Sequence, residues 1–266
     1  MVLTNDFVFI HFPKNAGSFV TECLQKVYDG RSSKKADKKW GDYITYLINR
    51  ENTQYAKKYI SKSLGYTGEK IKSQHQGCDE IPIQHQEKPI LSTIRNPFDR
   101  YVSQYKFGWW KKNPVLPPEK RHELFPNFPD LDFGQYLDLV LNYRLENTRQ
   151  KNNISADMGI YSLQFIQLFC KNYMDVLSSI NDIHQLDNNH FYTATFLHQE
   201  QLRDELYDYL QKQGWPESNI SFIRNAQKVN TSRDDFSYRR YYSQEQVDLI
   251  KEKEALIFRL FPDYSF

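Results

Sequence analysis

The hydrophobic pattern of the chain opens with a short apolar run, followed by a loop of small residues and then a helical repeat. Residues 7–12 are apolar except for His11 and are rich in residues that favour β structure. After the loop, apolar side chains recur at the spacing of one helix face, at Phe19, Cys23, Leu24 and Val27. The pattern predicts a strand, a loop and a helix in that order.

A second apolar run, over residues 89–94, predicts another strand. It leads into Asn96 and Pro97. This pair is typical of a helix start, because the asparagine side chain can cap the first turn and proline fits its first position. The predicted helix then carries apolar residues at helical spacing, at Phe98, Tyr101, Val102 and Tyr105.

The rest of the pattern is mainly helical. Further helices are predicted over residues 43–64, 133–145, 162–177, 201–211 and 243–261, and a further strand over residues 191–197. Five prolines between residues 114 and 129 predict an irregular loop. Strands that alternate with helices predict an α/β fold of three layers, in which helices flank a central parallel sheet. A chain of 266 residues without a linker-like stretch predicts one domain, residues 1–266.

Composition and charge narrow the class of protein. The net charge of +2 is too small to indicate a general nucleic-acid binder, and no segment is apolar over the length of a membrane span. Cys23, Cys78 and Cys170 show no paired spacing, so neither a disulfide framework nor a zinc site is indicated. We therefore expect a cytoplasmic protein without nucleic-acid or membrane partners. The sequence does not determine the oligomeric state.

The loop between the first predicted strand and helix has the properties of an anion site. A helix N-terminus after a strand offers backbone N–H groups and the positive end of the helix dipole. Lys14 adds a charge, Ala16 and Gly17 leave the backbone accessible, and the Ser18 hydroxyl can cap the helix or contact the ligand. Because the lysine precedes the small residues, the pattern G-x-x-x-x-G-K-[ST] is not met, which argues against a magnesium-dependent ATPase.

Two segments carry a resemblance to a known family. The segment His11-Phe12-Pro13-Lys14-Asn15-Ala16-Gly17-Ser18 resembles the 5′-phosphosulfate loop H-I-P-K-[TN]-[GA]-G-[TS] of sulfotransferases that use 3′-phosphoadenosine 5′-phosphosulfate (PAPS). The segment Arg95-Asn96-Pro97-Phe98-Asp99-Arg100-Tyr101-Val102-Ser103-Gln104-Tyr105 is similar to their 3′-phosphate motif R-[DN]-P-[YFW]-x-R-x-x-S-x-Y. The likeness extends over most of the chain and is weakest over residues 30–70 and 110–190.

The resemblance implies a P-loop-like form of the fold and an activity. A sulfuryl group would pass from PAPS to a hydroxyl or amine of a small-molecule or glycan acceptor, with adenosine 3′,5′-bisphosphate as the product and no metal. It implies that the donor is bound by Lys14, Asn15, Ala16, Gly17, Ser18 and Phe19, by Arg95 and Ser103 at the 3′-phosphate, and by Ser232 and Arg233 in a closing segment that resembles K-x-N-x-S-x-R.

Sulfuryl transfer is an in-line displacement at sulfur and needs a general base near neutral pKa, which points first to histidine. Lys14 would neutralise charge on the leaving oxygen. His75 is the first choice as base, because relatives with an acceptor-activating histidine carry it shortly before the strand of the 3′-phosphate motif. His85 is the alternative, Asp79 and Glu80 could serve if both histidines point away, and His11 is expected to pack beside the loop.

Two other functions stay open at the level of sequence. A small-molecule kinase of the P-loop class would share the strand, loop and helix, but would need magnesium ligands and a Lys-Ser or Lys-Thr pair. A non-catalytic nucleotide-binding relative would keep the loop and lack the base. On the acceptor side, the aromatic residues 107–110 and the proline-rich segment could wall a pocket for a ring-containing molecule, although such side chains more often pack in a core.

Overall fold

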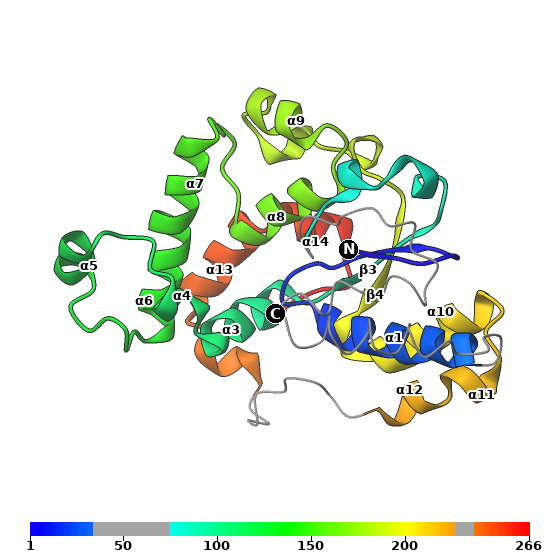
Figure 1. Ribbon diagram of the computed structural model, residues 1–266. Helices are drawn as coiled ribbons and strands as arrows, with labels where there is room; N and C mark the ends of the chain where they lie inside the picture. Colours follow the sequence, from blue (N-terminus) through cyan, green and yellow to red (C-terminus); the bar gives the residue numbers. More distant parts are fainter. Residues whose placement is uncertain (34–74, 227–236) are drawn as a thin grey trace. The chain divides into compact units, whose positions relative to one another are not determined.

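A computed structural model describes residues 1–33, 75–226 and 237–266. The chain forms two compact units: unit 1 comprises Met1–Ile94 and Thr193–Asn230, and unit 2 comprises Arg95–Tyr192 and Thr231–Phe266 (Figure 1). The helix predicted over residues 43–64 and two predicted donor residues, Ser232 and Arg233, lie outside the described residues. The single domain expected from the sequence stays a prediction.

Unit 1 is built on a four-stranded sheet in the order β1-β2-β3-β4. The strands are β1 (Val2–Leu3), β2 (Val8–Ile10), β3 (Ile90–Ile94) and β4 (Ala194–His198). The predicted α/β class is confirmed. The strands predicted over residues 7–12 and 89–94 are also confirmed, as β2 and β3. The sheet is mixed, however, because β1 pairs with β2 antiparallel while β2, β3 and β4 are parallel.

The antiparallel pair follows from a connection too short for any other arrangement. Thr4 lies in the turn between β1 and β2, where its hydroxyl donates to the Phe7 carbonyl at 2.6 Å and accepts from the Phe7 N–H at 2.9 Å. A parallel pair would need a crossover of a dozen or more residues. The predicted wholly parallel sheet is therefore wrong at this edge, because the apolar pattern shows no strand in the first residues.

The core of unit 1 lies between the sheet and two amphipathic helices, α1 (Gly17–Ser33) and α10 (Leu202–Lys212) (Figure 1). From the sheet, Phe9, Leu91 and Leu197 contribute side chains that are almost fully buried. The remaining elements of this unit are short: η2 (Cys78–Glu80), η3 (Ile83–His85), η7 (Gln199–Gln201), α11 (Glu217–Ile220) and α12 (Phe222–Asn225).

In the part that the structure describes, unit 2 is helical. It contains α3 (Pro97–Phe107), α4 (Trp109–Lys112), α5 (Pro118–Leu124), α6 (Phe133–Asp138), the π-helix η4 (Leu139–Arg144), α7 (Leu145–Lys151), α8 (Ile160–Phe169), α9 (Tyr173–Ser179), η5 (Ile183–Gln185), η6 (Asn188–His190), η8 (Tyr238–Tyr241), α13 (Gln244–Lys253) and α14 (Ala255–Leu260). The predicted start of α3 is confirmed, because Asn96 caps it by accepting from the Phe98 N–H at 3.0 Å.

The proline-rich segment was expected to be irregular, yet it contains α5. Pro118 stands at the first position of this helix, where a missing N–H costs nothing and the fixed φ angle suits the helix. Two adjacent prolines therefore begin a helix here instead of preventing one.

Two long predicted helices are interrupted in the structure. The helix predicted over residues 162–177 divides into α8 and α9, because Cys170 leaves the helix to form a bridge with Phe191 and Asn172 adopts a left-handed backbone. The helix predicted over residues 243–261 divides into α13 and α14 at Glu254.

Glu254 lies at the break between α13 and α14, and its side chain caps the N-terminus of α8. Its fully buried carboxylate accepts the backbone N–H groups of Tyr161 at 3.1 Å and Ser162 at 2.7 Å, the second and third residues of α8. The Ser162 hydroxyl at 2.7 Å and the Tyr101 hydroxyl at 2.5 Å complete the set of donors. Gly159, just before α8, has no room for a side chain, because a Cβ there would overlap this carboxylate. The cap thus joins α8, α13 and α3.

Candidate functional site

The predicted phosphosulfate loop leaves β2 after Ile10 and enters α1 at Gly17. Lys14 and Ala16 have positive φ angles of 66° and 61°, whereas Asn15 between them does not. A left-handed backbone costs a non-glycine residue about 1–2 kcal/mol, so the rest of the fold must impose it at both positions. Alternation of φ sign turns successive N–H groups toward one side, which is the geometry of backbone anion nests.

The donors at the end of this loop are available for a ligand. Within the described residues, the backbone N–H groups of Ala16, Gly17 and Ser18 have no hydrogen-bond acceptor. The first turn of α1 contains no acidic residue that would compete with an anion. Lys14, Ala16 and Ser18 keep partly exposed side chains, while Asn15 is buried. The loop can therefore bind an anion through three N–H groups and the positive end of α1.

Phe19, which was predicted among the donor-binding residues, packs inward. Its side chain is 6% exposed and belongs to the core of unit 1, and its N–H donates to the Ala16 carbonyl at 3.0 Å. It therefore fixes the position of the first turn of α1 beneath the loop.

Position 17 must be glycine, because the His11 side chain lies directly against its backbone. An added Cβ would overlap the imidazole of His11, with its nearest approach at Cδ2. His11 thus covers the start of α1, as expected for a residue that packs beside the loop. The glycine allows this close approach of ring and backbone.

His75 lies against the same loop. Its ring contacts the His11 ring edge-on at a centroid distance of 5.1 Å, and its Nδ1 is 3.2 Å from the His11 carbonyl oxygen. A carbonyl oxygen only accepts, so Nδ1 carries the proton in this contact and Nε2 of the neutral ring carries the lone pair. Desolvation lowers the pKa of His75 below its ordinary value of 6.5, and the hydrogen bond to the His11 carbonyl opposes this shift. These are properties of a general base at neutral pH.

The alternative bases have other contacts. His85 is 3% exposed, and its Nδ1 accepts from the Lys88 ammonium at 2.9 Å, while the same ammonium donates to the Thr4 carbonyl. The His85 ring is therefore almost wholly shielded from solvent. Glu80 accepts from the Gly77 N–H at 3.2 Å and from the Gln76 amide at 3.3 Å, which closes a short turn. His75, by comparison, contacts His11 at the start of the loop, and Asp79 is exposed.

In unit 2, Arg95 begins the second predicted motif as the residue that follows β3. The Tyr161 hydroxyl holds its backbone, accepting from the Arg95 N–H at 3.2 Å and donating to the Arg95 carbonyl at 3.1 Å. The Arg95 Nε donates to the Asp99 carboxylate at 2.7 Å, and both side chains are largely buried. The sequence analysis gave Asp99 no role, although its spacing one helical turn after Arg95 is the signal for such a pair.

Ser103 lies one further turn along α3 and is half-buried. Asp99 and Ser103 therefore share one face of α3 by the helical repeat, and Arg95, which precedes the helix, is joined to that face by its ion pair with Asp99. In unit 1 the structure thus places His75 against His11, whose ring also covers Gly17 at the end of the loop. In unit 2 it joins Arg95 to Asp99, one helical turn before Ser103.

Comparison with known proteins identifies no family for this chain. No protein-family model, curated protein or solved structure matches the chain, so the resemblance to sulfotransferases rests on its sequence motifs. Among the described residues there is no cluster of side chains that could hold a metal ion. In the same part of the chain, no helix combines the length and the apolar character needed to cross a membrane.

Proposed function

We propose that the chain is a PAPS-dependent sulfotransferase. The single observation that carries the proposal is the arrangement in unit 1, where a backbone nest and a helix N-terminus are covered by His11, whose carbonyl holds His75, the candidate base, through Nδ1. A nucleotide-binding loop alone would need no such base.

Each end of the donor has a group of matching chemistry in the proposal. The 5′-phosphosulfate belongs with the loop from Lys14 to Ser18, whose N–H groups and lysine suit an anion. The 3′-phosphate belongs with Arg95 and Ser103, because a guanidinium just before α3 and a hydroxyl on α3 suit phosphate oxygens. Asp99 fixes the guanidinium through Nε.

The chemistry then follows from the residues of unit 1. His75 Nε2 takes the proton of the acceptor hydroxyl or amine, whose oxygen or nitrogen forms the new bond to sulfur. The bond between sulfur and the bridging phosphate oxygen breaks, and its electron pair leaves with adenosine 3′,5′-bisphosphate. Lys14 and the N–H groups of the loop stabilise that negative charge. Fixation of Nδ1 by the His11 carbonyl keeps the base in the productive tautomer.

The proposal includes a P-loop-like fold for unit 1. The order strand, anion loop and helix, with β3 parallel to β2, supports it. A kinase of the same fold class is disfavoured, because no Lys-Ser or Lys-Thr pair follows Gly17.

The test measures the release of adenosine 3′,5′-bisphosphate from PAPS by chromatography. Sugars, phenols and amines are supplied in turn as acceptors. Acceptor-dependent release that falls at least about tenfold in Lys14→Ala supports the proposal. Tight donor binding without release would identify the non-catalytic alternative. Consumption of magnesium ATP instead of PAPS would identify the kinase.

A further inference from the structure

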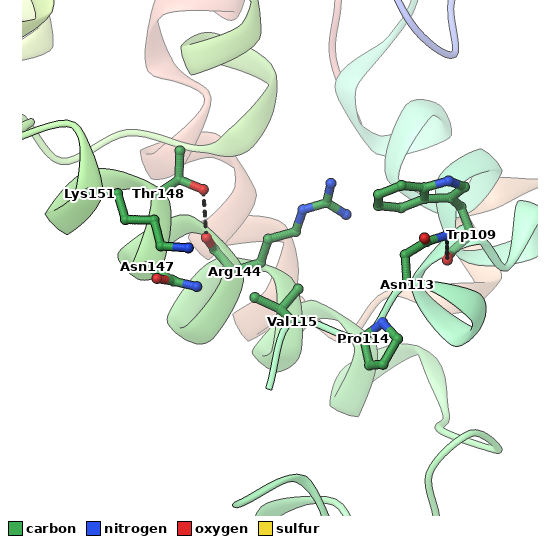
Figure 2. Close-up of a pocket in the computed structure, with 8 residues that line it drawn as sticks. All are labelled: Trp109, Asn113, Pro114, Val115, Arg144, Asn147, Thr148 and Lys151. Carbon is green, nitrogen blue, oxygen red and sulfur yellow. Dashed lines mark hydrogen bonds between the residues drawn. The ribbon is translucent and has the colours of Figure 1, made fainter. Parts of the chain in front are cut away.

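Unit 2 contains a hollow that the proposed donor chemistry does not use (Figure 2). Its volume of about 440 Å³ lies in the range of sites for small ligands. Two walls face each other across it, one from η4 and α7 and one from α4 and the segment that follows α4. Among the described residues, no carboxylate lines it.

The first wall is a polar and basic helix face. Arg144, Asn147, Thr148 and Lys151 follow one another at helical spacing where the π-helix η4 passes into α7. π-helical turns are rare and recur at functional sites. Here the turn ends at Arg144, and the Thr148 hydroxyl donates to the Arg144 carbonyl at 2.9 Å, a bond visible in Figure 2.

Arg144 is the central charge of the hollow. Its guanidinium lies 4.8 Å from the centre of the Trp109 ring, and partial burial lowers the pKa of this side chain. In the described residues, Arg144 has no ion pair with a carboxylate. Arg149, on the same helix, pairs with Glu146 at 3.3 Å and Asp157 at 3.5 Å. A partly desolvated cation without a counter-ion favours the binding of an anion.

The second wall is apolar with one amide. Trp109 is 46% exposed, although large aromatic side chains are usually buried, and Pro114 and Val115 extend its surface. The Asn113 side chain donates to the Trp109 carbonyl at 3.2 Å, which fixes the turn after α4. An indole and a proline ring offer the flat surface on which the C–H face of another ring packs.

We propose that this hollow binds an acidic sugar, that is, a hydroxylated ring with a carboxylate or sulfate group. The Arg144 fork suits the two oxygens of either anion, and Lys151 adds charge. Asn147 and Thr148 supply hydrogen bonds for ring hydroxyls, and Trp109 with Pro114 faces the ring. The inference goes beyond the proposed function and does not depend on it, because all the lining residues belong to unit 2.

The test is an NMR titration of the full-length protein with four matched probes: glucuronate, glucose 6-sulfate, glucose and inorganic sulfate. The indole N–H signal of Trp109 is the readout, and glucuronate and glucose 6-sulfate distinguish the two anion types. We expect at least one of these acidic sugars to bind about tenfold more tightly than glucose, the effect of one charge-assisted pair. Inorganic sulfate should bind more weakly than glucose 6-sulfate, because it lacks the ring.

The matched variants are Arg144→Gln and Arg121→Gln. Arg121 also stacks on a ring in unit 2, at 4.7 Å from the centre of Phe128, but does not line the hollow. Arg144→Gln should weaken acidic-sugar binding about tenfold and Arg121→Gln should leave it unchanged. If Arg144→Gln fails to fold by circular dichroism, Lys151→Gln, at an exposed position, replaces it with the same direction of effect.

Three results would overturn the inference. Equal binding of glucose and the acidic sugars, including no binding of any, removes the role of the charge. Equal binding of inorganic sulfate and glucose 6-sulfate removes the role of the ring. An equal effect of the two arginine variants removes the hollow as the location. None of these results bears on PAPS binding, which is measured separately.

Discussion

At the scale of single residues, the account depends on how His11 positions its neighbours. Its carbonyl fixes the Nδ1 proton of His75, and its ring lies so close to Gly17 that no other residue fits there. The sequence places His75 far from the loop, so only the family resemblance connected the two. The contact itself depends on how the chain returns to the loop before β3, which no local pattern encodes.

We expect His75→Ala to separate binding from turnover. Affinity for adenosine 3′,5′-bisphosphate should stay close to that of the original protein, while the rate of sulfuryl transfer falls roughly a hundredfold or more. A normal rate in His75→Ala would exclude it as the base. His190→Ala is the control, because this histidine pairs with Asp187 in unit 2.

The pH dependence follows from the same side chain. Its pKa is lowered by desolvation, so the neutral, basic form persists below the ordinary pKa of 6.5. The rate of transfer should be level near pH 7 and fall as the pH drops through this lowered pKa, because protonation of Nε2 removes the base. An acid limb centred above 6.5 would contradict this assignment.

Gly17→Ala tests the packing of the loop. The added carbon displaces the His11 ring and should weaken bisphosphate binding about tenfold, as measured by calorimetry. Gly134→Ala is the matched control, because Gly134 also lies in the first turn of a helix and its added carbon meets only the ends of two side chains, the Gln246 amide nitrogen at 3.0 Å and an Asp132 carboxylate oxygen at 3.4 Å. Unchanged binding in Gly17→Ala would show that the ring can move without cost.

At the scale of elements, the sequence predicted those strands and helix starts that depend on neighbouring residues alone. The apolar runs of β2 and β3 and the Asn96 cap of α3 are examples. The break at Glu254 could not be predicted, because its cause is a set of donors on α8 and α3 that lie distant in sequence. The same holds for the π-helix, whose local sequence favours an ordinary helix.

Glu254→Gln should destabilise the protein by about 2–4 kcal/mol in urea unfolding, because an amide nitrogen then faces donors that have lost their acceptor. Burial raises the pKa of Glu254, and the donors at its two oxygens oppose that rise. Glu252→Gln, an exposed neighbour on α13, should change stability by less than about 0.5 kcal/mol. Equal stabilities of the two variants would contradict the capping role.

At the scale of the whole molecule, the sequence indicated the class of fold and the donor motifs, but not the division into two units. The chain passes from β3 into unit 2 and returns to unit 1 before β4. The expected pocket wall at residues 107–110 stays a prediction: of these residues Trp109 lines the hollow and Trp110 is buried. Adjacent tryptophans on one helix turn cannot be told apart without their packing partners.

The three cysteines report on whether the units unfold together. All are buried, and burial raises the pKa of Cys23 to about 12, so native thiols should react slowly with iodoacetamide. Cys23 and Cys78 lie in unit 1 and Cys170 in unit 2. If the chain is one domain, all three should become reactive at one urea midpoint, as followed by mass spectrometry of labelled peptides. Separate midpoints would show two domains.

The proposed function depends on donor binding, with the loop from Lys14 to Ser18 assigned to the 5′ end of the donor and Arg95 to its 3′-phosphate. Calorimetric titration with adenosine 3′,5′-bisphosphate tests it most directly. The account predicts saturable binding that weakens about tenfold or more in Lys14→Ala and in Arg95→Ala, with much weaker binding of magnesium ATP. Absence of bisphosphate binding, or equal affinity for magnesium ATP, would contradict it.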